Sequence, residues 1–509
     1  MQKFLKKLKL FLLKRKKYPK NKKFFSIAEK FLKSKKISQQ KFSRPYLFKK
    51  GFQAEKIWIL ITPWLETAVP FFSYEIAEHL SSRKNKIGLI FDYTSPFNEK
   101  YSSKYLRLIQ TLEKLASNKY FVQTRETPKK IQMRQSRIHL LKSSIIENLI
   151  RFSKNEKEVI SNPKIINENL EKIKNYFSDI CCNLKNANVK KLIIPGGIYG
   201  LSFIYCYAAQ YLKIKYWTYD SGDNCLTLVK NGIAGHFPQF KKAFDMAKKI
   251  SKQKKVKSKI LKSVMGTLQE RIEGKDLFRL QPAWSNREKI ESDVLLLLNY
   301  RLDTAAMSQN RVFKSSSEWI EETAKLCNQK NFKLIIKQHP CEKYKKFRSN
   351  ESFFYLEKQY PQNVKYINYK MQINTYELIK KTKVVVPFSS RTGIEAYLFG
   401  KPIISHTNAF FDKLPFVTRA KNKSDYFNLI QRLVKTNSFK IQKKSEALLA
   451  YFLFEKCGFI KTKVTPIPAN FIKWASTFTS LKDPNFGMFI DCIDNSKNLY
   501  FELFKKQIK

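Results

Sequence analysis

Short apolar runs alternate with amphipathic stretches in two separate parts of the chain. The runs are continuously apolar and rich in Val, Ile and Leu, which is typical of parallel strands that are buried on both faces. The amphipathic stretches have apolar residues at helical spacing, so they predict helices that cover the sheets. Together they predict an α/β protein with two Rossmann-like domains facing each other across a cleft. The predicted strands lie at residues 57–62, 87–92, 191–195, 214–219, 293–298, 332–337, 363–368 and 384–386.

A polar region with several helix breakers separates the two series. It contains Pro238, Gly266, Gly274 and Pro282, and breakers of this kind mark a linker. The pattern therefore predicts five parts: a basic N-terminal segment (1–50), an N-terminal Rossmann-like domain with a helical insertion (51–240), a linker region (241–290), a C-terminal Rossmann-like domain (291–455) and a C-terminal extension (456–509).

Composition adds a large positive charge to this picture. The 509 residues include 98 Lys and Arg against 41 Asp and Glu, a formal net charge of +57. Such a field attracts nucleic acid, an anionic membrane surface or anionic small substrates, although a surface of solvated lysines has the same composition. The eight cysteines form no CxxC pair and predict neither a zinc site nor a disulfide framework. No apolar run reaches the length of a membrane span and no signal peptide is recognisable, so we expect a cytoplasmic protein.

Residues 1–24 mix Phe and Leu with many lysines. On a helix these residues form one apolar and one basic face, the pattern of a segment that lies in the interface of an anionic membrane. We therefore predict an amphipathic helix that attaches the protein peripherally to the inner face of the cytoplasmic membrane. A helix packed on the protein itself, or a basic tail, is the alternative.

The most informative stretch of the second series is 383–405. A β-branched strand at 384–386 is followed by the hydroxyl residues Ser389, Ser390 and Thr392, of the kind that begin a helix. A strand, a hydroxyl-rich turn and a helix N-terminus in this order form the arrangement by which α/β proteins bind phosphate.

His339 and Pro340 follow the predicted strand 332–337 directly. The proline fixes the backbone where the imidazole leaves the sheet, and a ring N–H there could contact a phosphate or a base. Because the carboxyl ends of parallel strands share one edge, we expect His339 to lie near Ser389 and Ser390. A histidine with a purely structural role is the alternative.

Two carboxylates follow a strand of the first series, in the sequence Asp220-Ser221-Gly222-Asp223. Catalytic groups lie at this position in open α/β sheets. An Asp/Gly turn that only ends the strand is the alternative.

Motifs for common cofactors are absent from the sequence. No GxGxxG follows the first strand of either series and no GxxxxGK[ST] occurs, so neither a dinucleotide cofactor nor a P-loop is expected. No Asp-x-Asp cluster is apparent, and we predict no metal and no cofactor.

The sequences IIKQHP (335–340), PFSSRTGIEA (387–396) and GKP (400–402) resemble a known family. They are similar to the bacterial capsule polysaccharide biosynthesis glycosyltransferases, GT-B enzymes that include transferases using CMP-Kdo. A similar His-Pro and Ser-Ser pair occurs in several bacterial sialyltransferases. The resemblance covers roughly residues 290–410 and implies a GT-B fold, with the nucleotide-sugar donor on the C-terminal domain and the acceptor on the N-terminal domain.

The resemblance also implies roles for individual residues of the C-terminal domain. His339 and Pro340 match the His-Pro motif, which contacts the cytidine nucleotide in such enzymes. Ser389 and Ser390 match the hydroxyl pair at its phosphate. Glu395 matches a Gly-x-Glu-Ala helix whose carboxylate reaches a nucleotide ribose in many GT-B enzymes.

Two further acidic motifs resemble the family with departures. Asp303-Thr304 is similar to the Asp-Thr that follows the first strand of this domain, while Asn299 stands where the family usually has Gln. The segment 220–223 is loosely similar to the acidic-acidic-Gly motif of the sialyltransferases, since Ser221 replaces the second acid.

These observations predict a glycosyltransferase that uses a nucleotide-sugar donor. The donor is expected to be a CMP-linked acidic sugar such as CMP-Kdo, and the acceptor a capsular or surface polysaccharide or a lipid-linked glycan. The turn 389–392 would hold the leaving phosphate, with His339, Lys337 and Arg391 adding positive potential.

The acidic motif of the first domain would supply the reacting carboxylate. Either Asp220 or Asp223 would act as the general base on the acceptor hydroxyl, or as a nucleophile if configuration is retained.

Other functions fit the same pattern. A CDP-glycerol-type phosphopolyol transferase and a UDP-sugar epimerase-like GT-B enzyme share the architecture. A nucleic-acid-binding protein would use the net charge, but base-reading motifs are absent and the lysines are spread along the chain, so no specific nucleic-acid partner is expected. An inactive scaffold of a polysaccharide assembly complex is the last alternative.

Overall fold

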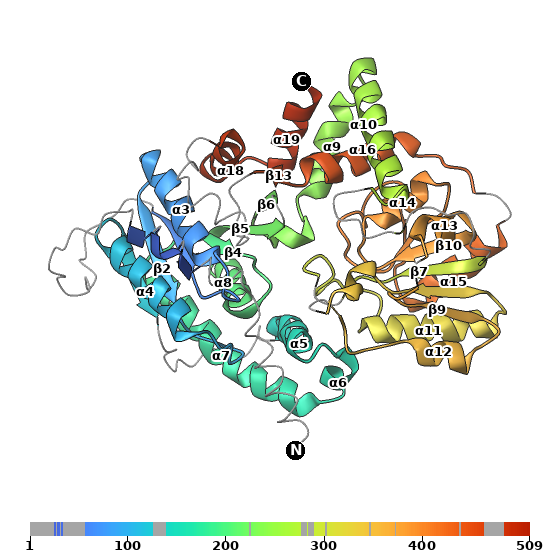
Figure 1. The fold of residues 1–509 in the computed structure, drawn as a ribbon, viewed down its shortest axis with the longest axis horizontal. Helices are drawn as coiled ribbons and strands as arrows, with labels where there is room; N and C mark the ends of the chain where they lie inside the picture. The colour runs from blue at the N-terminus through green and yellow to red at the C-terminus, as the bar shows by residue number, and fades with distance from the viewer. Residues whose placement is uncertain are drawn as a thin grey trace.

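The structure is a computed structural model of the 509-residue chain. Figure 1 shows a molecule with two α/β domains side by side and a group of helices joining them at one end. The structure describes residues 25–33 apart from 27 and 31, 56–125, 139–222, 225–275, 282, 290–300, 303–345, 348–371, 373–436, 439–462 and 483–509.

The first domain is built on a seven-stranded sheet with the order β13-β6-β5-β4-β1-β2-β3. Its parallel strands are β1 (Ile57–Ile61), β2 (Ile87–Asp92), β3 (Phe121–Arg125), β4 (Lys191–Pro195) and β5 (Lys215–Gly222). Two antiparallel strands extend it at one edge, β6 (Cys225–Lys230) and β13 (Ile460–Lys461).

Helices cover both faces of this sheet, which explains the continuous apolar runs in its strands. Alternate residues of β1 enter two different cores, with Ile57, Ile59 and Ile61 on one side and Trp58 and Leu60 on the other. The first core includes α3 (Val69–Ser82) and α4 (Ser103–Ser117), and the second includes α5 (His139–Ser153), α7 (Pro163–Asn186) and α8 (Gly200–Tyr211).

The second domain has a four-stranded parallel sheet with the order β10-β7-β8-β9. Its strands are β7 (Ser292–Leu297), β8 (Leu334–Lys337), β9 (Val364–Ile367) and β10 (Thr382–Pro387), and a separate pair is formed by β11 (Ile404–Ser405) and β12 (Thr418–Arg419). Its helices are α11 (Ser316–Gln329), α12 (Phe354–Gln359), α13 (Thr375–Lys380), α14 (Thr392–Leu398) and α15 (Lys423–Lys435).

Both sheets reverse their strand order at one point. The reversal lies between β1 and β4 in the first sheet and between β7 and β10 in the second. Ligands of open α/β sheets bind outside the carboxyl ends of the strands at such a point. The predicted fold class, two Rossmann-like domains of the GT-B kind, is confirmed.

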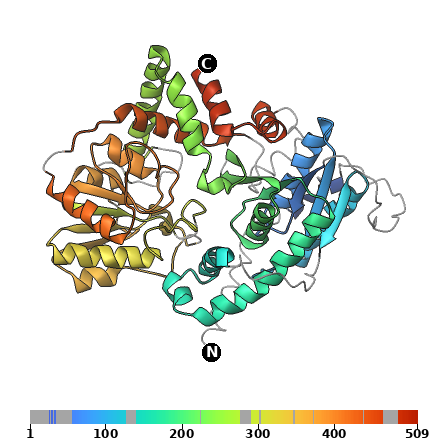
Figure 2. The same ribbon diagram turned by 180° about the vertical axis from the view of Figure 1, so that it is seen from behind.

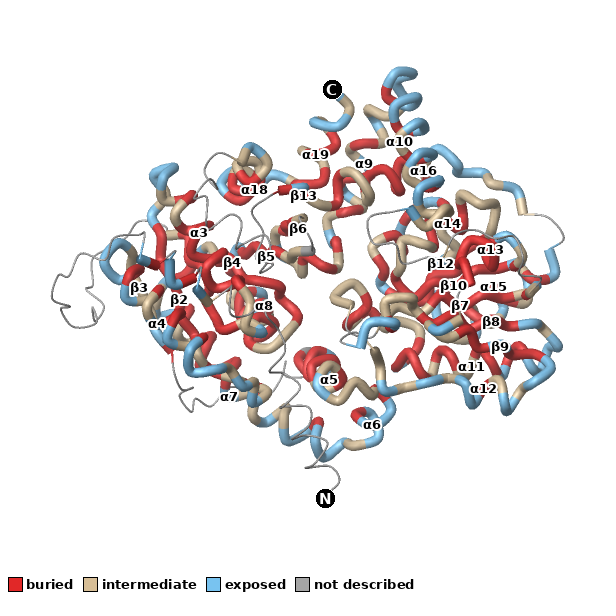
Figure 3. Tube along the Cα trace, in the orientation of Figure 1, coloured by how far each residue is buried: buried red, intermediate tan, exposed pale blue. Residues whose placement is uncertain are grey.

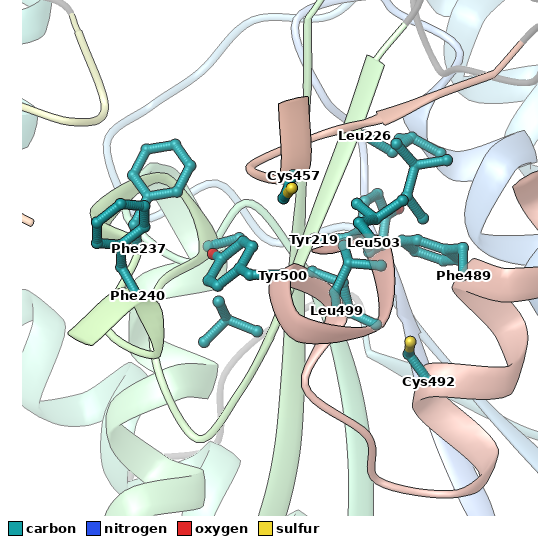
Figure 4. Close-up of a cluster of buried hydrophobic side chains, with 14 of the residues drawn as sticks. Tyr219, Leu226, Phe237, Phe240, Cys457, Phe489, Cys492, Leu499, Tyr500 and Leu503 are labelled. Carbon is teal, nitrogen blue, oxygen red and sulfur yellow. The ribbon is translucent and has the colours of Figure 1, made fainter. Parts of the chain in front are cut away.

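The chain joins the two domains at one end through helices from distant parts of the sequence. They are α9 (Phe240–Ile250), α10 (Lys254–Ile272), α16 (Lys444–Phe452), α18 (Pro484–Asp494) and α19 (Leu499–Ile508). Figure 4 shows Leu499, Tyr500 and Leu503 of α19 packed among Tyr219 of β5 and Phe240 of α9. The segment predicted as a C-terminal extension thus returns to the first domain, where β13 also extends the sheet.

On the opposite side, α5 and α6 (Glu156–Ile160) of the first domain approach α11 and α12 of the second (Figure 2). Figure 3 shows that buried residues concentrate in the two sheets and the helices packed on them, while α10 exposes much of its length. The domains are therefore in contact on both sides of the region between their sheets.

Two strands differ from the predicted elements, and one predicted helix lies outside the described residues. The strands β3 and β6 were not predicted, because β3 is a polar edge strand and β6 immediately follows the acidic turn. The predicted amphipathic helix at 1–24 lies outside the described residues. Within the described part of the chain, no helix is both long and apolar enough to cross a membrane.

Candidate active site between the two domains

Most of the predicted phosphate-binding residues, but not Ser389, line one pocket at the carboxyl edge of the second sheet. The pocket has a volume of about 110 Å³ and is lined by residues that follow β7, β8 and β10. The predicted residues among them are Lys337, His339, Pro340, Ser390, Arg391 and Thr392. The carboxyl ends of these three strands meet at the reversal of strand order, as the parallel-sheet argument requires.

Lys337 is the last residue of β8 and is 5% exposed. Burial lowers the pKa of its ammonium group from 10.5 to about 8. No carboxylate of the described residues forms an ion pair with it, so the charge of this lysine is available to an anion in the pocket.

His339 enters the pocket as a neutral donor. Its Nδ1 accepts a hydrogen bond from the backbone N–H of Cys341 at 3.1 Å, which leaves the proton of the neutral ring on Nε2. Burial, together with the positive charges of Lys337, Arg271 and Arg391, lowers the pKa of His339 to about 4. A neutral ring that donates through Nε2 can bind an anion without adding a fourth cation.

The hydroxyl-rich turn is held by its own hydrogen bonds. Ser390 Oγ donates to Thr392 Oγ1 at 3.0 Å and accepts the Thr392 N–H at 3.3 Å. The Ser389 N–H donates to Asn299 Oδ1 at 3.2 Å, and its buried Oγ has no hydrogen-bond partner in the structure. The following helix α14 has seven residues, so the positive potential comes mainly from side chains such as Arg391, which is paired with Glu455.

Arg271 of α10 also lines this pocket and was not predicted from the sequence. Its Nε forms an ion pair with Glu395 at 2.8 Å, and the same carboxylate accepts hydrogen bonds from Tyr376 at 2.9 Å and Tyr451 at 3.0 Å. Glu395 is fully buried and is not among the residues that line the pocket. The structure thus places this carboxylate where it positions Arg271, instead of at a nucleotide ribose as the resemblance implied.

A second group of polar side chains lies where the two domains touch. A Cβ atom on Gly235 would lie 2.3 Å from Thr304 Cγ2 of the second domain and 3.1 Å from Asp220 Oδ2 of the first. The backbone at Gly235 therefore has room for no side chain. The predicted residues Asp220 and Thr304, which are far apart in sequence, lie beside this one glycine.

Asp220 has a pKa close to the physiological range. Burial, with a smaller contribution from the charge of Asp303, raises the pKa of its carboxyl from 3.8 to about 6. The Ser221 N–H, which donates to Oδ1 at 2.8 Å, and the Thr304 hydroxyl act in the opposite direction. Burial raises the pKa of Asp303 as well, although Asn299 Nδ2 donates to it at 3.0 Å. With a pKa of about 6, the Asp220 carboxylate is suited to proton transfer near neutral pH.

The position of the acidic motif differs in detail from the prediction. Strand β5 continues through Gly222 and pairs with β6, so Asp220 lies within a strand and opposite Thr227. The second predicted carboxylate, Asp223, lies outside the described residues.

Three residues of this group were missed by sequence reasoning. Burial lowers the pKa of His236 to about 4, and its Nε2 has no partner in the structure. Tyr199 and Tyr300 both lie close enough to Asp220 for its charge to raise their pKa. The ring centroids of Tyr300 and His339 are 5.6 Å apart. Tyr300 therefore lies between the acidic group, Asp220 and Asp303, and the basic pocket lined by Lys337 and His339. None of the three has a local sequence signal, because their neighbours come from other parts of the chain.

No metal-binding cluster is present in the described residues. In those parts of the chain, no three His, Cys, Asp or Glu side chains are arranged to hold an ion.

Comparison with known proteins gives one informative match. Residues 228–454 match the family model for capsule polysaccharide biosynthesis proteins. The match includes the His-Pro segment and the Ser-Ser turn, so the predicted resemblance to this family is confirmed over these residues. A search of curated proteins finds no significant match.

Solved structures resemble the chain weakly. The β-Kdo 2,7-transferase KpsC of Thermosulfurimonas dismutans is 14% identical, with coverage of 54% of this chain and 79% of that chain and a TM-score of 0.31. MurG of Acinetobacter baumannii is 9% identical, with coverage of 78% and 94% and a TM-score of 0.25. The UDP-GlcNAc 2-epimerase of Methanocaldococcus jannaschii is 12% identical, with coverage of 78% and 99% and a TM-score of 0.25. Scores of this size add no evidence on function.

Proposed function

From the match of residues 228–454 to the capsule polysaccharide biosynthesis family, we propose that this protein is a glycosyltransferase of surface polysaccharide synthesis. One observation carries the proposal. A pocket lined by Lys337, Arg391 and Arg271 lies beside an acidic group whose member Asp220 has a pKa of about 6. A nucleotide-sugar transferase needs both features, because a phosphate leaves while a hydroxyl is deprotonated or a nucleophile attacks.

In the proposed mechanism the basic pocket binds the phosphate of the donor. Lys337 offsets the charge of the leaving nucleotide, and the Nε2–H of His339 donates to a phosphate oxygen. These donors are fixed before the reaction, because β8 and the Cys341 N–H hold them in place. The charge that develops on the leaving group is thereby stabilised by protein groups, so the proposed reaction requires no metal and no cofactor besides the nucleotide-sugar substrate.

Asp220 is the proposed reacting carboxylate on the other side. At neutral pH it is largely ionised, so it would take the proton of the acceptor hydroxyl, or attack the sugar if configuration is retained. The close contact between Gly235 of the first domain and Thr304 of the second places the second domain against Asp220.

We further propose a CMP-linked acidic sugar such as CMP-Kdo as the donor. The acceptor would be a capsular or surface polysaccharide or a lipid-linked glycan, reached from the inner face of the cytoplasmic membrane. The support is the His-Pro and Ser-Ser resemblance and the cationic lining of the pocket.

Nucleotide binding to variants of the pocket tests the proposal. We expect CMP to raise the thermal midpoint of the wild type, and this shift to be lost in His339→Ala and in a Ser389→Ala/Ser390→Ala double variant. Ser445→Ala, an exposed serine at the start of α16, should keep the shift and serves as the control. Equal shifts in all four proteins, or none in the wild type, would remove the assignment of this pocket.

The same measurement with other nucleotides separates the alternatives. A larger shift with CDP would favour a phosphopolyol transferase, and a larger shift with UDP would favour an epimerase-like enzyme. Transfer of Kdo from CMP-Kdo to a lipid-linked glycan then tests the activity itself.

A further inference from the structure

Arg151 of α5 faces the acidic group and has no role in the mechanism above. Resting on the proposed function, we propose that Arg151 binds the carboxylate of an acidic sugar at the site of transfer. The ligand class is a sugar carboxylate, carried either by the donor sugar or by the acidic end of the acceptor.

The guanidinium of Arg151 is held in place by an aromatic ring. It lies 3.5 Å from the centroid of the Tyr199 ring, a stacked contact that restricts its orientation. Tyr199 precedes α8 at the carboxyl end of β4, and its hydroxyl lies close to that of Thr304. Arg151 is therefore part of the same interdomain group as Asp220.

Arg151 lacks the carboxylate partner that three other arginines at or near the sheets have. Arg125 pairs with Asp92 and Asp179, Arg271 with Glu395, and Arg391 with Glu455. Arg151 forms no such ion pair in the described part of the chain. It lies close enough to Asp220 and Glu99 for its charge to lower the pKa of both carboxyls, yet it contacts neither within ion-pair distance. A half-buried, oriented and unpaired guanidinium is suited to an anion supplied from outside.

The position favours a carboxylate of the sugar over a phosphate. In the proposed mechanism the donor phosphate is bound by Lys337, His339 and Arg391 in the pocket of the second domain. Arg151 belongs to the first domain, on the side of Asp220, where the sugar carbon and the acceptor hydroxyl must meet. A sugar carboxylate there would be repelled by Asp220 and Asp303, and a planar guanidinium that binds it with two N–H groups offsets that repulsion.

Binding of three probes to Arg151 variants tests the inference. The probes are CMP, CMP-Kdo and the methyl β-glycoside of Kdo, measured by titration calorimetry on the full chain. We expect Arg151→Gln to weaken binding of a carboxylate-bearing probe by about 10- to 100-fold, the usual size for a lost charge-assisted hydrogen bond, and to leave CMP binding unchanged. Arg151→Lys should retain part of the affinity, because it keeps the charge but not the planar fork.

The control is Arg107→Gln on α4, which removes an equal charge from an exposed position of the same domain. Thermal midpoints of the two Gln variants should agree, which shows that both are folded. A loss confined to CMP-Kdo places the carboxylate on the donor, and a loss confined to the Kdo glycoside places it on the acceptor.

Two results would overturn the inference while leaving the proposed function intact. One is wild-type binding of CMP-Kdo no tighter than that of CMP, together with no binding of the Kdo glycoside. The other is an equal effect of Arg151→Gln on CMP and on the carboxylate-bearing probes, including no effect on either. Failure of the wild type to bind CMP or CMP-Kdo at all would instead overturn the proposed function and this inference together.

Discussion

Burial shifts the pKa of Lys337 and of Asp220 in opposite directions, and each shift has a functional consequence. Water stabilises the charged form of both groups, so removing water lowers the pKa of an ammonium and raises that of a carboxyl. Both charged forms are therefore less stable than they would be in solvent. A bound phosphate would stabilise the ammonium, whereas the carboxylate becomes a stronger base.

Asp220→Asn should lower activity and raise stability at the same time. The folded pKa of about 6 lies above the unfolded value of 3.8, so this carboxyl stabilises the fold below pH 4, and the contribution is lost as the pH rises through 6. At pH 8 we expect the variant to be more stable than the wild type by about 1 to 3 kcal/mol, and at pH 4 to show little gain. Thermal unfolding at the two pH values measures this.

Activity should depend on the same group. Transfer by the wild type should increase as the pH rises through about 6, and Asp220→Asn should reduce kcat by roughly 10²- to 10⁴-fold. A variant that is active, or one whose stability gain is the same at pH 4 and pH 8, would contradict the assigned role.

Lys337→Met should weaken nucleotide binding and stabilise the unliganded protein. Methionine fills a similar volume without a buried charge, so the cost of desolvating the ammonium disappears. We expect CMP affinity to fall by about tenfold or more, which calorimetry measures. The exposed Lys330→Met, which follows α11 in the same domain, is the matched control and should bind CMP like the wild type.

The pH dependence of CMP binding provides a second check on Lys337. Because its pKa is about 8, wild-type affinity should fall as the pH rises through that value. The fall should be absent in Lys337→Met. A fall of the same size in both proteins would assign it to another group.

At the scale of elements, a polar contact of α6 holds the first domain against the second. The carboxylate of Glu156 is 1% exposed and accepts the N–H groups of Ser316 at 3.3 Å and Ser317 at 2.9 Å, where α11 begins. In α5, Glu147 accepts the Ser308 N–H at 3.1 Å. An anion at the N-terminus of a fourteen-residue helix is favourable, because the first N–H groups of a helix have no partner within it.

Glu156→Gln should loosen this interdomain contact without unfolding either domain. An amide keeps one acceptor oxygen but loses the charge, so we expect a loss of about 1 to 3 kcal/mol in interdomain stability. Small-angle scattering should report a larger radius of gyration, and donor affinity should fall because the two halves of the site separate. The exposed Glu158→Gln on the same helix is the control. Unchanged scattering and affinity would show that the charge of Glu156 is not needed to hold the domains together.

Elements were predicted well where the signal is local. The apolar runs predicted as strands at 57–62 and 191–195 correspond to β1 and β4, because continuous burial of a strand appears directly in its composition. The edge strand β3 has a polar and partly exposed sequence, FVQTR, and was missed for that reason.

The site was predicted in part, and the missing residues share a physical cause. His339, Lys337 and the 389–392 turn follow strand ends, so parallel-sheet geometry alone places them together. Arg271 depends on Glu395, which lies in another element of the chain, and Arg151 depends on the ring of Tyr199. Contacts of this kind arise from packing between distant segments and leave no pattern in the local sequence.

At the scale of the whole molecule, the two domains are tied on both sides of the site. The helices α9, α16 and α19 join them at one end, and α5 with α6 does so at the other (Figures 1 and 2). The acidic group of the first domain and the basic pocket of the second therefore meet in the described structure. The tie on the α6 side is polar: Glu156 accepts N–H groups at the start of α11, and the Lys154 carbonyl accepts hydrogen bonds from Ser349 and Asn350.

The net charge of +57 bears on how the protein would reach the proposed lipid-linked acceptor. Charge alone attracts the whole surface to anionic vesicles, but that attraction is screened at about 0.15 M salt. The predicted amphipathic helix in residues 1–24 would add apolar burial, which salt does not weaken. We therefore expect the full chain to bind anionic vesicles at this salt concentration and a chain without residues 1–24 to bind only at low salt.

A Leu8→Ser/Leu12→Ser variant keeps every charge and should behave like the deletion, since it removes the apolar face. Sedimentation with anionic and neutral vesicles measures this, and equal binding of all three proteins would leave surface charge as the sole basis of attachment.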